Sequence, residues 1–379
     1  MAALVLKDPG EVTNKTALAS AITAAQAINL TLYTDASAAA VTSALSSAQT
    51  VYANAAATQA QADAATAALN GAVASLVLKQ TPAEGTFLSG TYNGRNYKLY
   101  VPASHASGTA APLLVMLHGS GQTPTQFASE TQMNALADER GFLVLYPEQP
   151  MSANGTLAWN WFSVAHQSRG SGEPALIAGM VGAVKTAYTI DSDRVFASGM
   201  GAGGAMAVIL GATYPDVFHG IGVSSGLEYK AATSVLTAYT AMYSGGPSPA
   251  TQGQLAYNAM GSYAAPVRLL VMQGSTDTTV YPVNGNQVLS QWAVTNDLAD
   301  DGTANGSVDD TAELTQAGTS AGGKSYTRYV YENSGGDILM EKYVVTGMGY
   351  GWPGGSASGS KTQPTGPDLS RILCDFFLN

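Results

Sequence analysis

The chain has 379 residues, of which 46% are hydrophobic and 11% charged, and its formal net charge at pH 7 is −10. The apolar content excludes general disorder, and the acidic balance without a Lys/Arg cluster argues against a nucleic-acid partner or an anionic membrane surface. No apolar run approaches the ~18 residues that span a bilayer, so no membrane insertion is expected. The single cysteine, Cys374, excludes an internal disulfide and a cysteine-based zinc site.

Residues 11–79 are dominated by alanine and contain no proline, a composition that favours helix. Three helices are predicted, at 14–29, 35–54 and 58–78, and together they would form a small bundle. Asp35 is expected to cap the second helix, and Thr58 with Gln61 forms a capping box for the third. The third helix carries an apolar stripe at helical spacing. Its members are Ala65, Leu69, Val73, Leu76 and Val77.

A near-duplicate hexapeptide stands at both ends of this segment, AALVLK at 2–7 and ASLVLK at 74–79. One explanation is chance in an Ala/Leu-rich chain. The other is that residues 1–10 are the tail of a preceding repeat. Residues 14–70 resemble the FIVAR modules of bacterial surface proteins, which act mostly as spacers or adhesive stalks. The resemblance implies a secreted or cell-surface parent, attached to the cell wall or cell surface through further repeats.

Residues 80–85 contain proline and glycine and are interpreted as a linker to a second domain at 86–379. In that domain apolar strands alternate with helices, which predicts a mostly parallel sheet covered on both faces, the α/β class. Strands are predicted at 97–101, 113–117, 142–146, 195–198, 221–224, 267–272, 326–331 and 339–345, and helices at 127–140, 175–188, 202–212, 284–295 and 368–377.

An acidic loop is predicted between Asp297 and Asp310, with five aspartates and two glycines. Calcium binding is one interpretation, but the spacing matches no EF-hand loop. A solvated loop is the favoured interpretation, and no metal site is predicted anywhere in the chain.

Residues 195–206 have the layout of a nucleophile elbow, in which an apolar strand enters a glycine-rich turn and a small-residue helix leaves it. Gly199 and Gly203 stand where such a turn leaves no room for side chains. The central residue of the motif is normally serine, but here it is Gly201. A plain strand-turn-helix would explain the glycines, but not the matching features elsewhere in the domain.

Other parts of an acyl-transfer site follow the same order along the chain as in α/β-hydrolases. A buried strand ends in a turn with His118 and Ser120, where such enzymes place one oxyanion-hole amide, and Ala202 would supply the other. A later strand ends in a turn with one acidic residue, Asp277. A glycine-rich loop at 347–355 comes last and contains Tyr350.

These landmarks, together with the aromatic run at 159–162, resemble the extracellular polyhydroxybutyrate depolymerase and feruloyl esterase-like family from about residue 85 to 379. The resemblance implies a secreted carboxylic-ester hydrolase with a Ser-Asp-His triad and with no metal or organic cofactor. The implied partner is an ester-bearing polymer or a small ester ligand.

The departures from that family concern the catalytic residues. The family's nucleophilic serine falls on Gly201 and its catalytic histidine on Tyr350, so that only the acid, Asp277, remains. A cysteine pair that is usual in the family falls on Ser120 and Ala158. Tyrosine, with an ordinary pKa near ~10, is a poor general base at neutral pH.

Replacements for the missing groups are scarce among the four histidines. His118 is expected at the cleft, where its role would be to hold the oxyanion loop by hydrogen bonds. His105 and His219 are interpreted as surface or packing residues, and His166 is the one that could lie near the cleft. The string GVSSG at 222–226 matches GxSxG but lacks a following small-residue helix, so it is interpreted as a decoy.

Three tryptophans, Trp159, Trp161 and Trp352, either line the cleft or pack beneath its loops. The sequence therefore predicts an ester-hydrolase scaffold that is inactive or nearly so. Two explanations stay open: an ester hydrolase whose catalytic residues were replaced by design, and a natural pseudoenzyme kept as a surface-binding or structural module. Low charge and a Ser/Thr/Asn/Gly-rich composition favour a secreted or cell-surface location.

Overall fold

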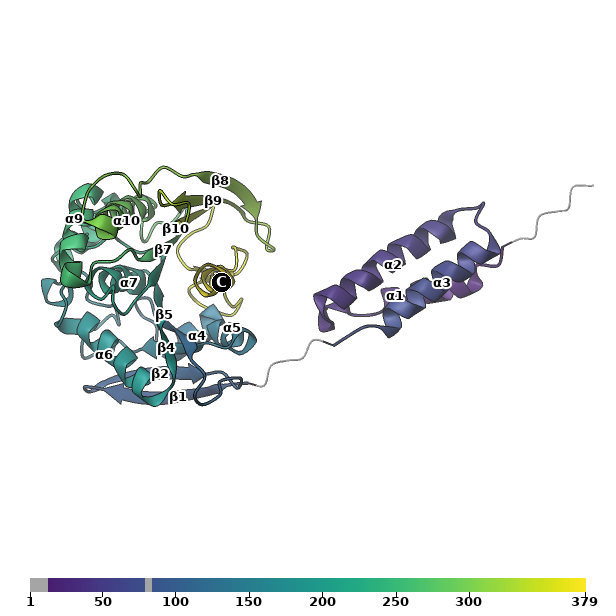
Figure 1. Ribbon diagram of the computed structural model, residues 1–379, viewed down its shortest axis with the longest axis horizontal. Coiled ribbons are helices and arrows are strands. Elements are labelled where there is room, and N and C mark those ends of the chain that lie inside the picture. Colours follow the sequence, from purple (N-terminus) through teal and green to yellow (C-terminus); the bar gives the residue numbers. More distant parts are fainter. Residues whose placement is uncertain (1–12, 79–83) are drawn as a thin grey trace, which may run out of the picture. The chain divides into compact units, whose positions relative to one another are not determined.

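The computed structural model describes residues 13–78 and 84–379, which belong to two compact units divided between Thr81 and Pro82 (Figure 1). We call residues 13–78 the N-terminal unit and residues 84–379 the C-terminal unit. The proposed repeat tail at 1–10 and most of the linker at 80–85 lie outside the described residues.

The N-terminal unit consists of three helices, in keeping with the sequence prediction. They are α1 (Thr16–Gln26), α2 (Asp35–Ala53) and α3 (Gln59–Ala74), with a short 3-10 turn, η1 (Leu30–Leu32), between the first two. Every helix packs against the other two. Their shared core is small and alanine-rich, because so few large apolar side chains are available. It consists of Leu18, Ala21, Ile22, Ala25, Ala48, Ala62 and Leu69.

The helix ends show where local sequence signals hold. The Thr58–Gln61 capping box is present, with the Thr58 amide donating to Gln61 Oε1 at 2.8 Å. The capping role expected for Asp35 is wrong, because Thr34 is the N-cap residue and Asp35 is the first residue of α2. Helix α3 ends at Ala74, so Val77 lies beyond it with 58% of its surface exposed and does not continue the apolar stripe.

The C-terminal unit is built on a ten-stranded sheet with the order β1-β2-β4-β3-β5-β6-β7-β10-β9-β8. The central strands, from β4 to β10, are parallel, and the strands at both edges pair antiparallel. The strands are β1 (Thr86–Tyr92), β2 (Arg95–Val101), β3 (Ala111–Leu117), β4 (Leu143–Pro147), β5 (Ile190–Met200), β6 (Gly220–Ser224), β7 (Arg268–Gly274), β8 (Leu314–Thr319), β9 (Ser325–Glu332) and β10 (Ile338–Val345).

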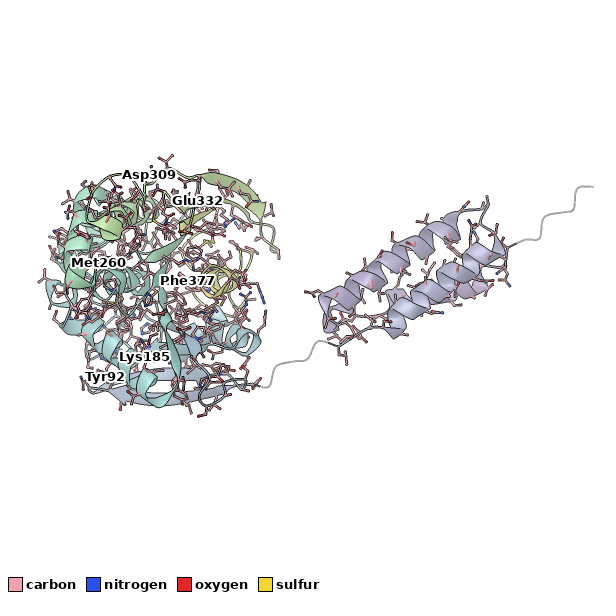
Figure 2. The ribbon with its side chains drawn as sticks, in the orientation of Figure 1. Tyr92, Lys185, Met260, Asp309, Glu332 and Phe377 are labelled. Carbon is pink, nitrogen blue, oxygen red and sulfur yellow. The ribbon has the colours of Figure 1, made fainter. Side chains whose placement is uncertain are left out.

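Helices cover both faces of this sheet, which confirms the predicted α/β class (Figure 1). One face is covered by α6 (Gly172–Ala187), α7 (Ala202–Thr213), α8 (Val235–Ser244), α9 (Pro249–Met260) and α10 (Val283–Asp301). The other face is covered by α4 (Pro124–Thr131), α5 (Met133–Arg140) and α11 (Leu369–Leu378). Side chains fill the space on both faces, with Met260 on the first side and Phe377 on the second (Figure 2).

All eight predicted strands are present, and the differences lie in elements that the sequence analysis missed or misplaced. Strand β1 was not predicted, although Asn93 and Gly94, both with positive φ, form the tight hairpin turn that joins it to β2. The helix predicted at 127–140 is two helices, because Gln132 takes a left-handed conformation with φ of 56°. Strand β8 and helices α8 and α9 were also missed.

The acidic segment at 297–310 is only partly a loop. Helix α10 continues to Asp301 and ends at Gly302, whose φ is 83°. The carboxylates are engaged locally: Asp297 accepts from the Ser307 hydroxyl at 2.9 Å, and Asp301 accepts from the Thr303 amide at 2.8 Å. These two aspartates therefore form hydrogen bonds with the end of the helix and the turns that follow it.

Candidate functional site

The turn between β5 and α7 has the geometry that the elbow motif requires. Gly201 joins the strand to the helix with φ 57° and ψ −116°, a conformation that L-residues adopt only under strain. The glycines around it are needed for close approach, since a Cβ on Gly203 would lie 2.0 Å from the carbonyl oxygen of Leu117. The chain has therefore kept the sharp strand-to-helix turn but has no side chain at its apex.

The space above Gly201 is filled by Tyr350. A Cβ on residue 201 would lie 2.1 Å from the Tyr350 hydroxyl oxygen, well inside van der Waals contact. Burial, and then the nearby negative charge of Asp277, raise the pKa of the Tyr350 phenol well above its ordinary value. The phenol therefore stays protonated at neutral pH, so that it can donate a hydrogen bond but cannot act as a general base.

Asp277 stands at the carboxyl end of β7, where the third member of a triad is expected. It is buried, and its Oδ1 accepts hydrogen bonds from the amides of Thr279 at 2.8 Å and Val280 at 3.0 Å. Its Oδ2 has one longer contact, 3.4 Å from Gln273 Nε2. The carboxylate is thus held in place by its own turn, without a histidine to orient.

The two expected oxyanion-hole residues, Ser120 and Ala202, both line the cavity beside Gly201. Ala202 is the first residue of α7, so its amide has no partner within the helix. Neither the Ser120 nor the Ala202 amide donates a hydrogen bond to another described residue. The Ser120 hydroxyl is turned away towards the carbonyl of Thr156, at 3.1 Å.

We call the cavity above Gly201 the binding cavity; its volume is about 470 Å³. A few polar side chains and a larger number of aliphatic and aromatic ones line it. The lining residues used below are Ser120, Trp161, Ala202, Tyr239, Tyr350 and Lys361. Lys361 is the only lining residue with a charged side chain, and no acidic residue of the described chain lines the cavity.

Lys361 is a residue that the sequence analysis missed. It immediately precedes β12 (Thr362–Gln363), which pairs with β11 (Trp352–Pro353) just after Tyr350. The amide of Trp352 donates to the Lys361 carbonyl at 2.8 Å, and the Lys361 ammonium donates to the Ser120 carbonyl. No local motif announces this residue, because it reaches the cavity only through pairing of two short segments.

Of the four residues expected at the cleft, the structure places only Trp161 in the cavity lining. Its ring packs edge-on against Phe162, with ring centres 5.6 Å apart. Trp352 is buried beneath the loop, where its Nε1 donates to Ser370 Oγ at 3.0 Å and its ring packs against Phe127. It therefore supports the Tyr350 loop from below.

His118 and Trp159 are also buried outside the cavity lining. The imidazole of His118 contacts the carbonyl of Gly119 through Nδ1 at 2.9 Å and accepts from the Gln149 amide through Nε2 at 3.1 Å. Burial lowers the pKa of His118 to about 4, so the ring is neutral and both nitrogens are engaged. Trp159 Nε1 donates to the His118 carbonyl at 3.1 Å. Both residues hold the oxyanion loop and do not face a ligand.

The remaining histidines do not reach the cavity either. His166 Nδ1 accepts from the Glu173 amide at 3.0 Å, and the His105 ring packs near Tyr188. Across residues 13–78 and 84–379, no histidine lines the binding cavity. The serines of the GVSSG string, Ser224 and Ser225, are buried at the end of β6 and are also absent from its lining.

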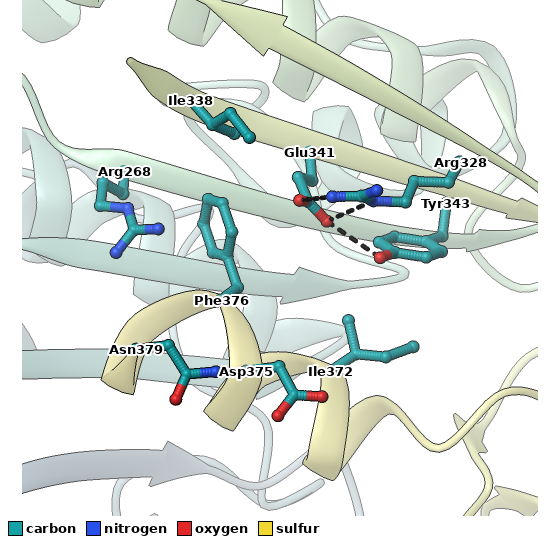
Figure 3. A pocket seen from close by; sticks show the side chains of 9 residues that line it. All are labelled: Arg268, Arg328, Ile338, Glu341, Tyr343, Ile372, Asp375, Phe376 and Asn379. Carbon is teal, nitrogen blue, oxygen red and sulfur yellow. Dashed lines mark hydrogen bonds and ion pairs between the residues drawn. The ribbon is translucent and has the colours of Figure 1, made fainter. Parts of the chain in front are cut away.

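A second cavity of about 290 Å³ lies between β9, β10 and α11 (Figure 3). Its central acid, Glu341, accepts from Arg328 Nε at 3.1 Å and from the Tyr343 hydroxyl at 2.9 Å. Arg328, Glu341 and Tyr343 therefore form a closed hydrogen-bonded group in this cavity. Among the described residues, no three His, Cys, Asp or Glu side chains gather as metal ligands, and no helix is long and apolar enough to span a membrane.

Comparison with known proteins places this architecture among esterases. The sequence profile of the Esterase PHB depolymerase family matches residues 95–317, a range that includes Ser120, Gly201, Ala202 and Asp277. A poly(3-hydroxyalkanoate) depolymerase C from Paucimonas lemoignei is 34% identical over 263 residues, covering 69% of this chain and 60% of that protein. This chain thus spans less than two thirds of that relative's length.

Two further relatives support the same assignment. A feruloyl esterase B from Thermothelomyces thermophilus is 30% identical over 209 residues, covering 53% of this chain and 71% of that protein. The structure of an acetyl xylan esterase from Aspergillus awamori superposes with a TM-score of 0.59 at 25% identity, covering 70% of this chain and 94% of that one. The elbow, the buried acid and the matching profile agree, and the chain belongs to the Esterase PHB depolymerase family.

Proposed function

We propose that residues 86–379 are an ester-hydrolase scaffold that binds an ester-bearing polymer or a small ester but hydrolyses it slowly or not at all. The observation that carries this proposal is the position of the Tyr350 hydroxyl, 2.1 Å from where a Cβ on residue 201 would stand. The space that a nucleophile's side chain needs is occupied by a group that is neither nucleophile nor base at neutral pH.

The chemistry of ester hydrolysis by this fold needs a nucleophile and a base within hydrogen-bond reach. Gly201 has no atom that can attack a carbonyl, and the Tyr350 phenol holds its proton. His118 and His166 are engaged elsewhere. What remains is the oxyanion hole and the cavity, which leave about 10³–10⁴-fold acceleration over water when the triad of a serine protease is removed.

The ligand class is supported by the relatives and by the cavity. The relatives are named for poly(3-hydroxyalkanoate), feruloyl and acetylxylan substrates, all of which contain ester bonds. The volume of about 470 Å³ lies within the range of small-molecule sites, and the cavity wall is largely apolar with a few polar groups. This arrangement suits an ester whose carbonyl lies beside the Ser120 and Ala202 amides.

We propose for residues 11–79 a separate role as a FIVAR-like spacer, and for the whole chain a secreted or cell-surface location. The three-helix fold and the small alanine-rich core support an autonomous module without chemistry of its own. Both explanations for the missing triad, replacement by design and natural loss in a surface-binding or structural pseudoenzyme, are compatible with this proposal. The codons at positions 201 and 350 of the native gene would decide between them.

The proposal is tested by assaying the purified chain on p-nitrophenyl butyrate and labelling it with a fluorophosphonate. We expect turnover no more than about 10³–10⁴-fold above the uncatalysed rate, and no labelled serine. Labelling of Ser120, the one serine in the cavity lining of the described chain, would overturn the proposal by identifying a different nucleophile. A Ser120→Ala variant would then abolish the label.

A further inference from the structure

Several hydrogen-bond donors in the lining of the binding cavity have no acceptor within the described chain. The amides of Ser120 and Ala202 have no partner among the described residues. The hydroxyl of Tyr350 makes no hydrogen bond within the described chain, and it stays protonated. These three residues line the same cavity, and unpaired donors in one cavity are an arrangement that proteins use to hold a negative charge.

Lys361 adds a full positive charge to this group of donors. Its ammonium has three N–H donors, of which one goes to the Ser120 carbonyl. It forms no ion pair of 4.0 Å or less with any acid of the described chain, and no acidic side chain lines the cavity. A cation in a largely apolar cavity is costly unless an anion joins it.

The charges outside the lining do not cancel this positive end. The acid whose charge acts on Tyr350 is Asp277, and its Oδ1 already accepts two amide hydrogen bonds. Burial lowers the pKa of Lys361, and the negative charge of Glu130 acts in the opposite direction. The Glu130 carboxylate is itself engaged, because its Oε1 accepts from the amide and hydroxyl of Ser360 and its Oε2 accepts from Gln122. Helix α7 also directs its positive N-terminal end at the cavity, at Ala202.

The remaining lining residues of the cavity indicate the chemistry of the rest of the ligand. Trp161 and Phe162 lie on one part of the wall, and helix α8 contributes Val235, Ala238, Tyr239 and Met242. This surface offers aliphatic and aromatic contacts and no charge. The complementary molecule has an apolar body of moderate size and a single negative group at one end.

From this juxtaposition we propose that the binding cavity is a receptor for carboxylates with an apolar body, held through Lys361, Tyr350 and the amides of Ser120 and Ala202. Such a molecule is the acid half of an ester, either free or as the terminus of an oligoester. The inference rests on the proposed function, because a working hydrolase would release this acid whereas a silent scaffold can retain it. A neutral ester would use the two amides but would leave the Lys361 ammonium without its counter-charge.

The test compares three nearly isosteric probes by isothermal titration calorimetry on the full chain: 4-phenylbutanoate, 4-phenylbutanamide and methyl 4-phenylbutanoate. We expect the carboxylate to bind about tenfold or more tightly than the amide and the ester, because hydrogen bonds to a charged group are the stronger ones. Equal affinity for carboxylate and amide, or no measurable binding of the carboxylate, would overturn the inference.

Variants separate the proposed contacts from general effects. Lys361→Gln should remove the preference for carboxylate over amide, and Tyr350→Phe should weaken carboxylate binding by a few-fold. Lys185→Gln removes the same charge from α6, outside the cavity lining, and should leave the preference unchanged. Retention of the full preference in Lys361→Gln would contradict the inference, and the wild-type comparison of probes decides it even if that variant fails to fold.

The same experiment keeps this inference distinct from the proposed function. Hydrolysis of the methyl ester, measured as release of methanol, would show that the chain is a hydrolase. That result would contradict the proposed function but not the inference. The comparison of the carboxylate with the amide involves no ester. It therefore measures the charge preference of the cavity whether or not the chain hydrolyses esters.

Discussion

The indole Nε1–H of Trp159 donates a hydrogen bond to the main-chain carbonyl of His118, 3.1 Å away, and both side chains are buried. The two residues lock the turn that carries Ser120 into the cavity wall. Both side chains pack behind this turn, which is why neither lines the cavity although the sequence predicts them near the cleft.

Substitution of His118 tests this supporting role. His118→Ala would leave the Gln149 amide buried without its acceptor and would open a cavity, for which we expect a loss of roughly 2–4 kcal/mol in the free energy of unfolding. Urea denaturation of the full chain measures this change. His105→Ala, at a ring that packs near Tyr188, is the matched control and should lose less. Equal losses in the two variants would contradict the role assigned to His118.

The contact between Gly201 and Tyr350 predicts the outcome of restoring a triad. Gly201→Ser alone should lower the melting temperature and give little esterase activity, because its Cβ would meet the Tyr350 hydroxyl at 2.1 Å. Gly201→Ser with Tyr350→His should recover hydrolysis of p-nitrophenyl butyrate by about 100-fold or more over either single variant, since triad members act as a unit.

A third variant separates the steric effect from the missing base. Gly201→Ser with Tyr350→Ala relieves the close contact but supplies no imidazole, so it should melt above Gly201→Ser alone and stay inactive. It should still melt below the parent, because a side chain at 201 keeps the strain of the positive φ. If this variant or Gly201→Ser alone is as active as the double variant with histidine, another residue must serve as the base.

Glu228 predicts a pH dependence of stability. It follows β6, only 2% of its surface is exposed, and neither carboxyl oxygen has a hydrogen-bond partner among the described residues. Burial raises the pKa of Glu228 from 4.5 to about 8 in the folded protein. Between these values the folded state keeps a proton that the unfolded state has lost. Stability from this group is therefore complete below pH 4.5 and is lost as the pH rises towards 8, at roughly 1.4 kcal/mol per pH unit.

Thermal or urea unfolding between pH 5 and pH 9 checks this prediction. Glu228→Gln should flatten the decline and stabilise the protein at pH 8, whereas Glu84→Gln, at an exposed position, should follow the parent. If the stability of Glu228→Gln declines with pH as steeply as that of the parent, other groups cause the decline.

Because the chain forms two compact units, we expect the C-terminal unit to fold without the N-terminal unit. Deletion of residues 1–80 should leave residues 85–379 folded, with an unchanged melting transition and an unchanged affinity for 4-phenylbutanoate, because each unit has its own buried core. Differential scanning calorimetry and the titration described above measure both quantities. A drop of several degrees, or weaker binding, would mean that the N-terminal unit supports the cavity.

Much of the fold could be predicted from short stretches of chain, although two local features, the hairpin strand β1 and the N-cap of α2, were missed. Features that depend on contacts between distant segments could not be predicted in this way. The buried strands, the elbow glycines and the capping box at Thr58 are local patterns, and the structure contains all of them. Helix α8 was missed although it forms part of the cavity wall and begins with a local signal, the Ser234–Thr237 capping box. Lys361 was missed because its role depends on the pairing of β11 with β12.

For the site residues, the sequence likewise predicted positions along the chain but not contacts between side chains. Resemblance to a family assigned Gly201, Asp277 and Tyr350 to their positions, but no pattern in the sequence could show that the tyrosine hydroxyl fills the space left by the missing serine side chain. The aromatic run at 159–162 also looked uniform, yet Trp161 faces the cavity while Trp159 is turned to His118. Which way a side chain points is decided by packing partners far away in the sequence.

The close contact of residues 201 and 350 also restricts the order in which mutations could restore hydrolysis. A serine that arises first at 201 would collide with the tyrosine and would meet selection as a destabilised protein. A histidine that arises first at 350 removes the tyrosine hydroxyl, so a serine that follows meets only the strain of the positive φ at 201. Under the proposed function, the route to a catalytic serine at 201 therefore starts at position 350, in the loop that bears the tyrosine.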